Sequence, residues 1–162
     1  MASMDKPRIH SAELLAAGPV RHQALARFVV ETRRPGLVDV TREVGALLAE
    51  AQAGTGLATL FVRHTSASLT IQENASPEVL DDLVDALDRL APRDAPWRHD
   101  DEGPDDMPAH VKTMLTDASL NIPVLGGRLT LGTWQAIYLV EHRDRPHRRE
   151  IVLCFQGTKA SE

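Results

Sequence analysis

The stretch LATLFVRHTSASLTIQE, residues 57–73, decides the fold of this chain. Its first part, 57–62, is a short continuous apolar run, which is typical of a buried strand. From Ser66 to Glu73 apolar and polar residues alternate, which predicts a second, half-buried strand. The polar side of that second strand carries serine, threonine and glutamine, so it is unusually rich in hydroxyl groups.

Further strands and helices are expected on both sides of this stretch. The other expected strands are 23–33, a strand from 119 to a glycine turn at 126–127, a long strand 128–141 and a last strand 150–156. The expected helices are 41–53, 77–90 and one from Asp105 or Asp106 to about residue 116. This order favours an α+β domain with mainly antiparallel strand pairing.

The composition is that of a folded globular domain. The chain has 162 residues, 43% hydrophobic and 25% charged, so global disorder is excluded. We expect one domain over 21–158 and a poorly ordered N-terminal extension over 1–20. The net charge of −5 argues against a nucleic-acid partner. Because no apolar stretch spans a bilayer and the start lacks a secretory signal, we expect a cytoplasmic protein with no membrane partner.

Seven histidines stand against a single cysteine, Cys154. One cysteine cannot form an internal disulfide or a thiolate metal site, so any bound metal must be held by histidine and carboxylate groups. Cys154 itself lies in the apolar segment IVLCF and is expected to be a small core residue. The imbalance directs attention to histidines that have acidic neighbours.

His110 shares one face of its expected helix with Met107 and Met114, and we expect that face to point inward. A buried imidazole needs a partner for each ring nitrogen, so a core histidine bonded to a carbonyl is an alternative to a site residue.

Carboxylates crowd the loop that begins at His99, and four of them are candidate site residues: Asp100, Glu102, Asp105 and Asp106. Like charges repel, and a divalent cation or a cationic partner would relieve the repulsion. A flexible acidic loop explains the same spacing equally well.

His64 directly follows the buried strand and precedes Thr65, Ser66 and Ser68. A histidine followed by small hydroxyls is suited to binding a phosphate ester, because hydroxyls and backbone N–H groups donate to it. A solvated strand end is the alternative. The glycine-rich signatures of dinucleotide sites and P-loops are absent from the sequence.

Polar side chains also interrupt and close the long expected strand. Gln135 is an amide in an apolar run, and when buried it must be paired by backbone or by a ligand. His142 stands at the strand end, where binding groups collect when sheets form a cleft. The basic run that follows, including His147, is expected to be mainly a charged hairpin loop.

Three segments together resemble the YjbQ-like family. They are HTSASLTIQEN at 64–74, HDDEGPDDMPAHVK at 99–112 and SLNIPVLGGRLTLGTWQAIYLVEHR at 119–143. Members of that family are described as uncharacterised proteins or as secondary thiamine-phosphate synthases. The resemblance covers about 23–157. It implies an α+β fold with an antiparallel β-sandwich-like core, helices packed on that core, and assembly as a homotrimer.

The resemblance also implies which residues matter. Matching positions are His64, Glu73, Asn74, His99, Asp100, Glu102, Asp105, Asp106, His110, Gln135, His142 and Arg143. Asp101 departs from the pattern, since relatives often carry an aromatic residue there. The implied activity joins a pyrimidine diphosphate to a thiazole phosphate, which gives thiamine phosphate and pyrophosphate.

The favoured hypothesis is a small metal-assisted enzyme acting on phosphorylated small molecules, and the alternative is a trimeric module that binds a metal or phosphometabolite without turnover. The expected metal ligands are His99, His110 and His142, holding a divalent ion such as zinc or magnesium. The expected catalytic residues are His64, Glu73, Asp105 and Asp106. The expected substrate-binding residues are Ser66, Ser68, Asn74, Lys112, Gln135 and Arg143.

Overall fold

The computed structural model describes residues 10–160, which form a mixed α/β fold. The strands of this part are β1 (His22–Thr32), β2 (Gly36–Asp39), β3 (Ala53–Val62), β4 (Ala67–Glu73), β5 (Ser119–Leu125), β6 (Arg128–Leu129), β7 (Gln135–Glu141) and β8 (His147–Lys159). Its helices are α1 (Thr41–Glu50), α2 (Pro77–Leu90) and α3 (Asp106–Leu115).

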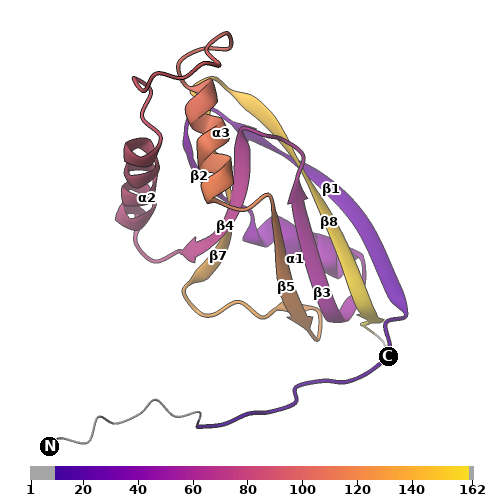
Figure 1. The fold of residues 1–162 in the computed structure, drawn as a ribbon. Helices are drawn as coiled ribbons and strands as arrows, with labels where there is room; N and C mark the ends of the chain where they lie inside the picture. The colour runs from indigo at the N-terminus through magenta and orange to yellow at the C-terminus, as the bar shows by residue number, and fades with distance from the viewer. Residues whose placement is uncertain (1–9, 161–162) are drawn as a thin grey trace, which may run out of the picture.

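The strands form two antiparallel sheets (Figure 1). One has the order β1-β8-β3-β5-β6 and the other the order β2-β7-β4. Every strand pairing within residues 10–160 is antiparallel, so the sequence prediction of antiparallel sheets with helices is confirmed. The two strands formed by residues 57–73, the end of β3 and β4, fall in different sheets.

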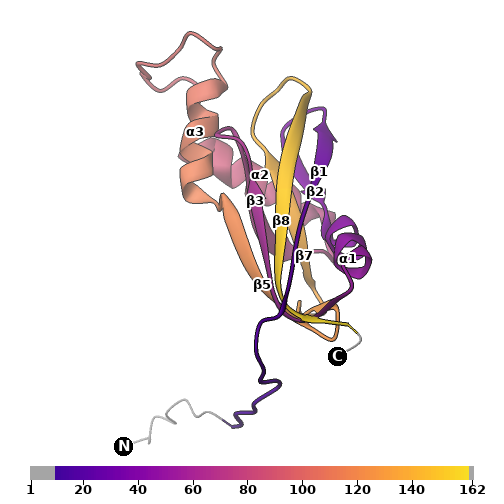
Figure 2. The same cartoon turned by 90° about the vertical axis from the view of Figure 1, so that its right-hand side faces the viewer.

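The hydrophobic core lies between the two sheets and α1. Its fully buried side chains include Leu48 of α1, Leu60 of β3, Leu139 of β7 and Leu153 of β8. In strand β8 buried and less buried side chains alternate strictly from Arg149 onward, so every second side chain points into the core. Figure 2 shows α1 and α3 on opposite sides of the strands, which leaves α3 free to build a site outside the core.

The predicted long strand 128–141 is wrong, because the chain changes sheets within it. β6 ends at Leu129 in the larger sheet, and β7 begins at Gln135 in the smaller one. A turn closes between them: Gly132 N–H donates to Gln135 Oε1 at 2.8 Å, and Gln135 N–H donates to Gly132 O at 3.0 Å. Gln135 is therefore the exposed first residue of β7, with its amide bonded to the preceding turn, and not a buried amide within a long strand.

Three smaller expectations also need correction. Helix α1 ends at Glu50 and β3 begins at Ala53, because Gln52 takes a positive φ of 52° and turns the chain early. β8 begins at His147, so the basic loop is shorter than expected. On α3, Met114 is 86% exposed, so only part of the expected inward face is covered.

The predicted poorly ordered extension is only partly described. Residues 1–9 lie outside the described residues, while 10–21 contain neither helix nor strand and expose their side chains. Between residues 10 and 160, none of the helices combines the length and the apolar character that a bilayer crossing requires.

Candidate functional site

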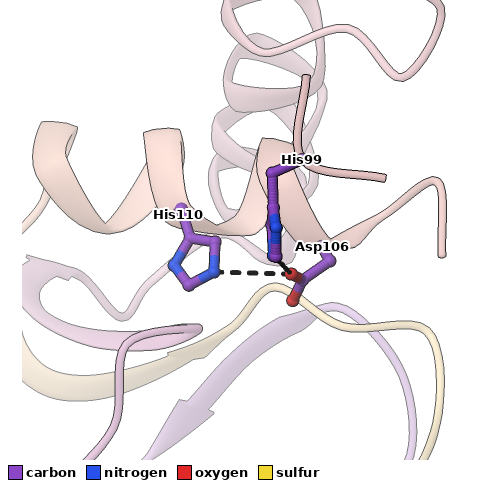
Figure 3. Close-up of side chains that lie close together, drawn as sticks. All are labelled: His99, Asp106 and His110. Carbon is purple, nitrogen blue, oxygen red and sulfur yellow. Dashed lines mark hydrogen bonds and ion pairs between the residues drawn. The ribbon is translucent and has the colours of Figure 1, made fainter. Parts of the chain in front are cut away.

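Two histidines and one aspartate converge at α3 (Figure 3). Asp106 and His110 are four residues apart on α3, which puts them on the same helix face. His99 reaches them from the preceding loop. Nε2 of His99 lies 2.9 Å from Asp106 Oδ2, and Nε2 of His110 lies 3.4 Å from the same oxygen. Both imidazoles therefore aim at one carboxylate oxygen.

The second ring nitrogen of His110 fixes its tautomer. Nδ1 lies 3.1 Å from the backbone oxygen of Thr65. A carbonyl can only accept, so Nδ1 carries a proton and donates it, and in the neutral ring this leaves a lone pair on Nε2. In that state the lone pair faces the carboxylate oxygen, and either a proton or a metal cation between the two atoms would satisfy both. The same arrangement orients histidine ligands in metal sites.

Asp106 is buried and rigidly held by Arg143. One guanidinium nitrogen, Nη1, pairs with Asp106 Oδ1, while Nε donates to Asp105 Oδ2 at 3.0 Å. Nη2 donates to the backbone oxygen of Glu102 at 2.9 Å. Burial disfavours the charge on Asp105, but hydrogen bonds from Asp144 N–H and from Arg143 hold the pKa of its carboxyl below the ordinary value. Arg143, predicted to bind substrate, is thus engaged with the acidic residues.

His142 does not join this cluster, and Asp106 takes the place that was predicted for it. His142 is 3% exposed, and its Nε2 lies 2.8 Å from the Oγ of Ser68. Burial, followed by the nearby Lys112 cation, lowers the pKa of His142 to about 4. His142 is therefore a neutral, hydrogen-bonded interior residue at neutral pH.

This buried histidine predicts a loss of stability in mild acid. Below pH 6.5 the unfolded chain protonates His142 while the folded chain does not, so protons favour unfolding until the pH falls to about 4. Between pH 7 and pH 5 the free energy of unfolding is expected to fall by about 2 kcal/mol. Urea denaturation across this range measures it. In His142→Gln, which keeps a hydrogen-bonding partner for Ser68, the part of the slope that His142 contributes should vanish; an unchanged slope would contradict the assignment.

Arg149 lies in this region on β8, although the sequence predicts a charged loop there. Its Nε and Nη2 donate to the two oxygens of Glu141 at 2.7 and 2.5 Å, and Nη2 also lies 3.1 Å from Ser66 Oγ. Both side chains of the ion pair are fully buried. The sequence did carry a signal: counting back in twos from Phe155, Arg149 falls on the apolar face of its strand.

The predicted residues fall into two groups in one chain. Ten of them lie at the end of the smaller sheet near α3: His64, Ser66, Ser68, His99, Asp105, Asp106, His110, Lys112, His142 and Arg143. Glu73, Asn74 and Gln135 lie at the other end: Glu73 pairs with Gln135, whereas Ala67 pairs with Glu141. Six residues of strand separate the two ends by about 20 Å. Lys112 is buried and pairs with Asp88.

A hollow of about 400 Å³ borders the histidine cluster on the side of His99. Trp97, Met107 and Pro108 are among the residues that line it. Its volume lies within the range of small-molecule sites.

Comparison with known proteins places this chain in a family. Residues 26–158 match the family model described as UPF0047 protein YjbQ-like. A UPF0047 protein of Synechocystis is 47% identical over 138 residues, which cover 85% of this chain and 92% of that protein. A crystal structure of a hypothetical protein from Aeropyrum pernix is 35% identical, has a TM-score of 0.77 and is matched over 83% of this chain and 99% of its own.

A conserved hypothetical protein from Thermus thermophilus, also solved as a crystal structure, agrees with this assignment. It is 42% identical, with a TM-score of 0.71 and coverage of 79% of this chain and 97% of its own. Sequence, family match and fold lead to one conclusion: this chain belongs to the YjbQ-like UPF0047 family.

Proposed function

We propose that this protein is a small metal-assisted enzyme acting on phosphorylated small molecules, with His99, Asp106 and His110 as metal ligands. One observation carries the proposal. The Nε2 atoms of both histidines converge on the buried Oδ2 of Asp106, and the Thr65 carbonyl leaves His110 Nε2 with a lone pair toward that oxygen. A shared cation is the simplest way to satisfy these groups together.

Zinc suits this donor set best. In a tetrahedral zinc site with bonds of about 2.0–2.1 Å, neighbouring ligand atoms are about 3.3 Å apart, close to the observed separations of 2.9 and 3.4 Å. Magnesium prefers an all-oxygen set, which two imidazoles do not provide. Two histidines and one carboxylate leave a position open, and a bound zinc ion supplies Lewis acidity toward a phosphate oxygen there.

The residues around the cluster have their own roles in this proposal. Arg143 holds Asp106 in place through Oδ1 and leaves Oδ2 facing the histidines. His64 and the hydroxyl-rich start of β4 lie beside α3, because Thr65 contacts His110 and Thr113. We propose that the exposed His64 binds a substrate phosphate, whereas Ser66 and Ser68, which were predicted to bind substrate, are buried and bonded to neighbouring side chains. The specific reaction, thiamine phosphate formation with release of pyrophosphate, rests on the family resemblance.

Turnover tests this function directly. The wild-type protein loaded with zinc is given the pyrimidine diphosphate and the thiazole phosphate, and thiamine phosphate is measured. Because Asp106 is a proposed ligand, Asp106→Asn is expected to lower the rate by about 100-fold or more. His64→Ala, which removes the proposed phosphate contact, serves as the second variant. Equal rates in wild type and both variants would indicate a contaminant; zinc binding without product would support the binding-module alternative.

Self-association forms the second part of the proposal. β1 and β3 turn Leu25, Val29, Leu57 and Phe61 to the sheet face that points away from the core, and each is more than 40% exposed. Large apolar side chains gathered on one face are typical of a protein interface. We propose that three copies associate through this face, as the family resemblance implies.

Two charges placed on this face are expected to separate the copies. Leu25→Glu combined with Phe61→Glu introduces like charges where we expect apolar contact, so light scattering should give the 17.8 kDa chain mass for this variant and three times that mass for wild type. Leu90→Glu, at an equally exposed leucine on α2, is the matched control and should keep the wild-type mass. A monomeric wild type, or a double variant of unchanged mass, would contradict the proposed interface.

A further inference from the structure

The imidazole of His64 contacts Ser66, the first of a series of buried polar side chains that continues through Arg149 to Glu141. We propose that the Glu141–Arg149 ion pair acts through Ser66 to keep His64 as the Nε2–H tautomer, so that His64 offers a hydrogen-bond donor to an anionic oxygen of the ligand. The assignment of a ligand rests on the proposed function, whereas the tautomer does not. Ser66 and Arg149 are positioning residues in this proposal.

Two donors meet at Nδ1 of His64. The backbone N–H of Ser66 donates to it at 3.0 Å, and a backbone N–H cannot accept a hydrogen bond. Nδ1 must therefore be unprotonated, and in the neutral ring the proton sits on Nε2. The Ser66 hydroxyl oxygen lies at the same distance, 3.0 Å, from Nδ1.

Arg149 sets the direction of that hydroxyl. Its Nη2 lies 3.1 Å from Ser66 Oγ and can only donate, so the oxygen accepts there and its own hydrogen is free to point at His64. Arg149 in turn is aligned by both oxygens of Glu141. One further nitrogen, Nη1, is buried without a hydrogen-bond partner among the described residues.

The surrounding charges act in the same direction. Burial lowers the pKa of His64 most, the Arg149 cation adds to this, His147 and Arg143 contribute, and only Glu141 opposes them. The ring is therefore neutral at neutral pH. No hydrogen bond within residues 10–160 occupies Nε2, and the residue is exposed, so its N–H is available to solvent or a ligand.

This state determines what His64 can do. Nε2 carries the proton, so it has no lone pair with which to take a proton from a substrate, but it can donate a hydrogen bond to a phosphate oxygen. Because His64 donates as a neutral imidazole, it adds no positive charge that would repel a metal ion bound at the neighbouring cluster. The ligand chemistry that fits is an oxyanion, and inorganic phosphate is its simplest probe.

Nitrogen NMR on the full-length protein, labelled with ¹⁵N-histidine, tests the tautomer. At neutral pH the His64 signal, assigned by its loss in His64→Gln, is expected to show a protonated Nε2 and an unprotonated Nδ1. In Ser66→Ala, which removes the hydroxyl and keeps the backbone N–H, the Nδ1 signal should shift while Nδ1 stays unprotonated. Ser68→Ala is the matched control, because Ser68 is an equally buried serine bonded to His142 instead; it should change the His142 signal alone.

Two results would overturn the tautomer proposal: a protonated Nδ1 in wild type, or a His64 spectrum that Ser66→Ala leaves unchanged. Titration with inorganic phosphate then tests the donor role. His64→Gln keeps an N–H donor and should retain affinity within about threefold, whereas His64→Leu should lose about tenfold or more. Equal affinities in both variants would refute the donor role. None of these measurements needs metal or turnover, so their failure is distinguishable from a failure of the proposed reaction.

Discussion

Replacing Arg149 with methionine is expected to lower the free energy of unfolding by about 3–5 kcal/mol. Arg149 and Glu141 are both fully buried and share two hydrogen bonds. Without the guanidinium, Glu141 keeps Thr32 Oγ1 and Arg143 N–H as donors but has no countercharge. An uncompensated carboxylate in the interior is far more costly than a missing apolar contact. Urea denaturation at neutral pH measures the loss.

A double variant separates the charge effect from a packing effect. Glu141→Leu combined with Arg149→Met removes both charges and keeps similar volume, so it should recover most of the stability lost in Arg149→Met. Arg149→Lys keeps the charge but loses the paired geometry, and we expect an intermediate value. A loss below about 1 kcal/mol in Arg149→Met would contradict a buried, uncompensated Glu141.

Replacing Asp106 with asparagine is expected to weaken zinc binding by on the order of 1,000-fold, because it removes the only carboxylate that faces both imidazoles within the described cluster. Asparagine keeps the shape and the hydrogen bond to Arg143, so the fold should survive. Competition with a chelator of known affinity gives the dissociation constant. Asp100→Asn is the matched control: it removes the same charge from an exposed position in the same loop, and its affinity should stay within about threefold of wild type. Equal weakening in both variants would show that only net charge matters.

The sequence predicted elements best where hydrophobic periodicity was long. The helix expected over 77–90 matches α2, and the strand expected over 23–33 matches β1 to within one residue. The predicted strand 128–141 was wrong, because a turn closed by the side chain of Gln135 interrupts it. Hydrophobic periodicity also carries no information about which sheet a strand joins.

The site was predicted in part for a similar reason. His110 and Asp106 could be paired from helical spacing, and His99 from its acidic neighbours. Asp106 takes the position in the cluster that was predicted for His142, because the sequence does not show that His142 is buried beside Ser68 while Asp106 faces His99. Arg149 could not be singled out from its charged neighbours, because only the strand that follows places it on the apolar face.

The metal content of purified protein tests the proposed centre most directly. Wild type, His110→Ala and His142→Gln are each equilibrated with excess zinc, freed of unbound metal and measured for zinc per chain. We expect wild type and His142→Gln to hold equal zinc and His110→Ala to hold almost none, since His110 lies in the cluster and His142 does not. Equal zinc in wild type and His110→Ala, or loss of zinc in His142→Gln alone, would contradict the assignment of His99, Asp106 and His110 as the metal site.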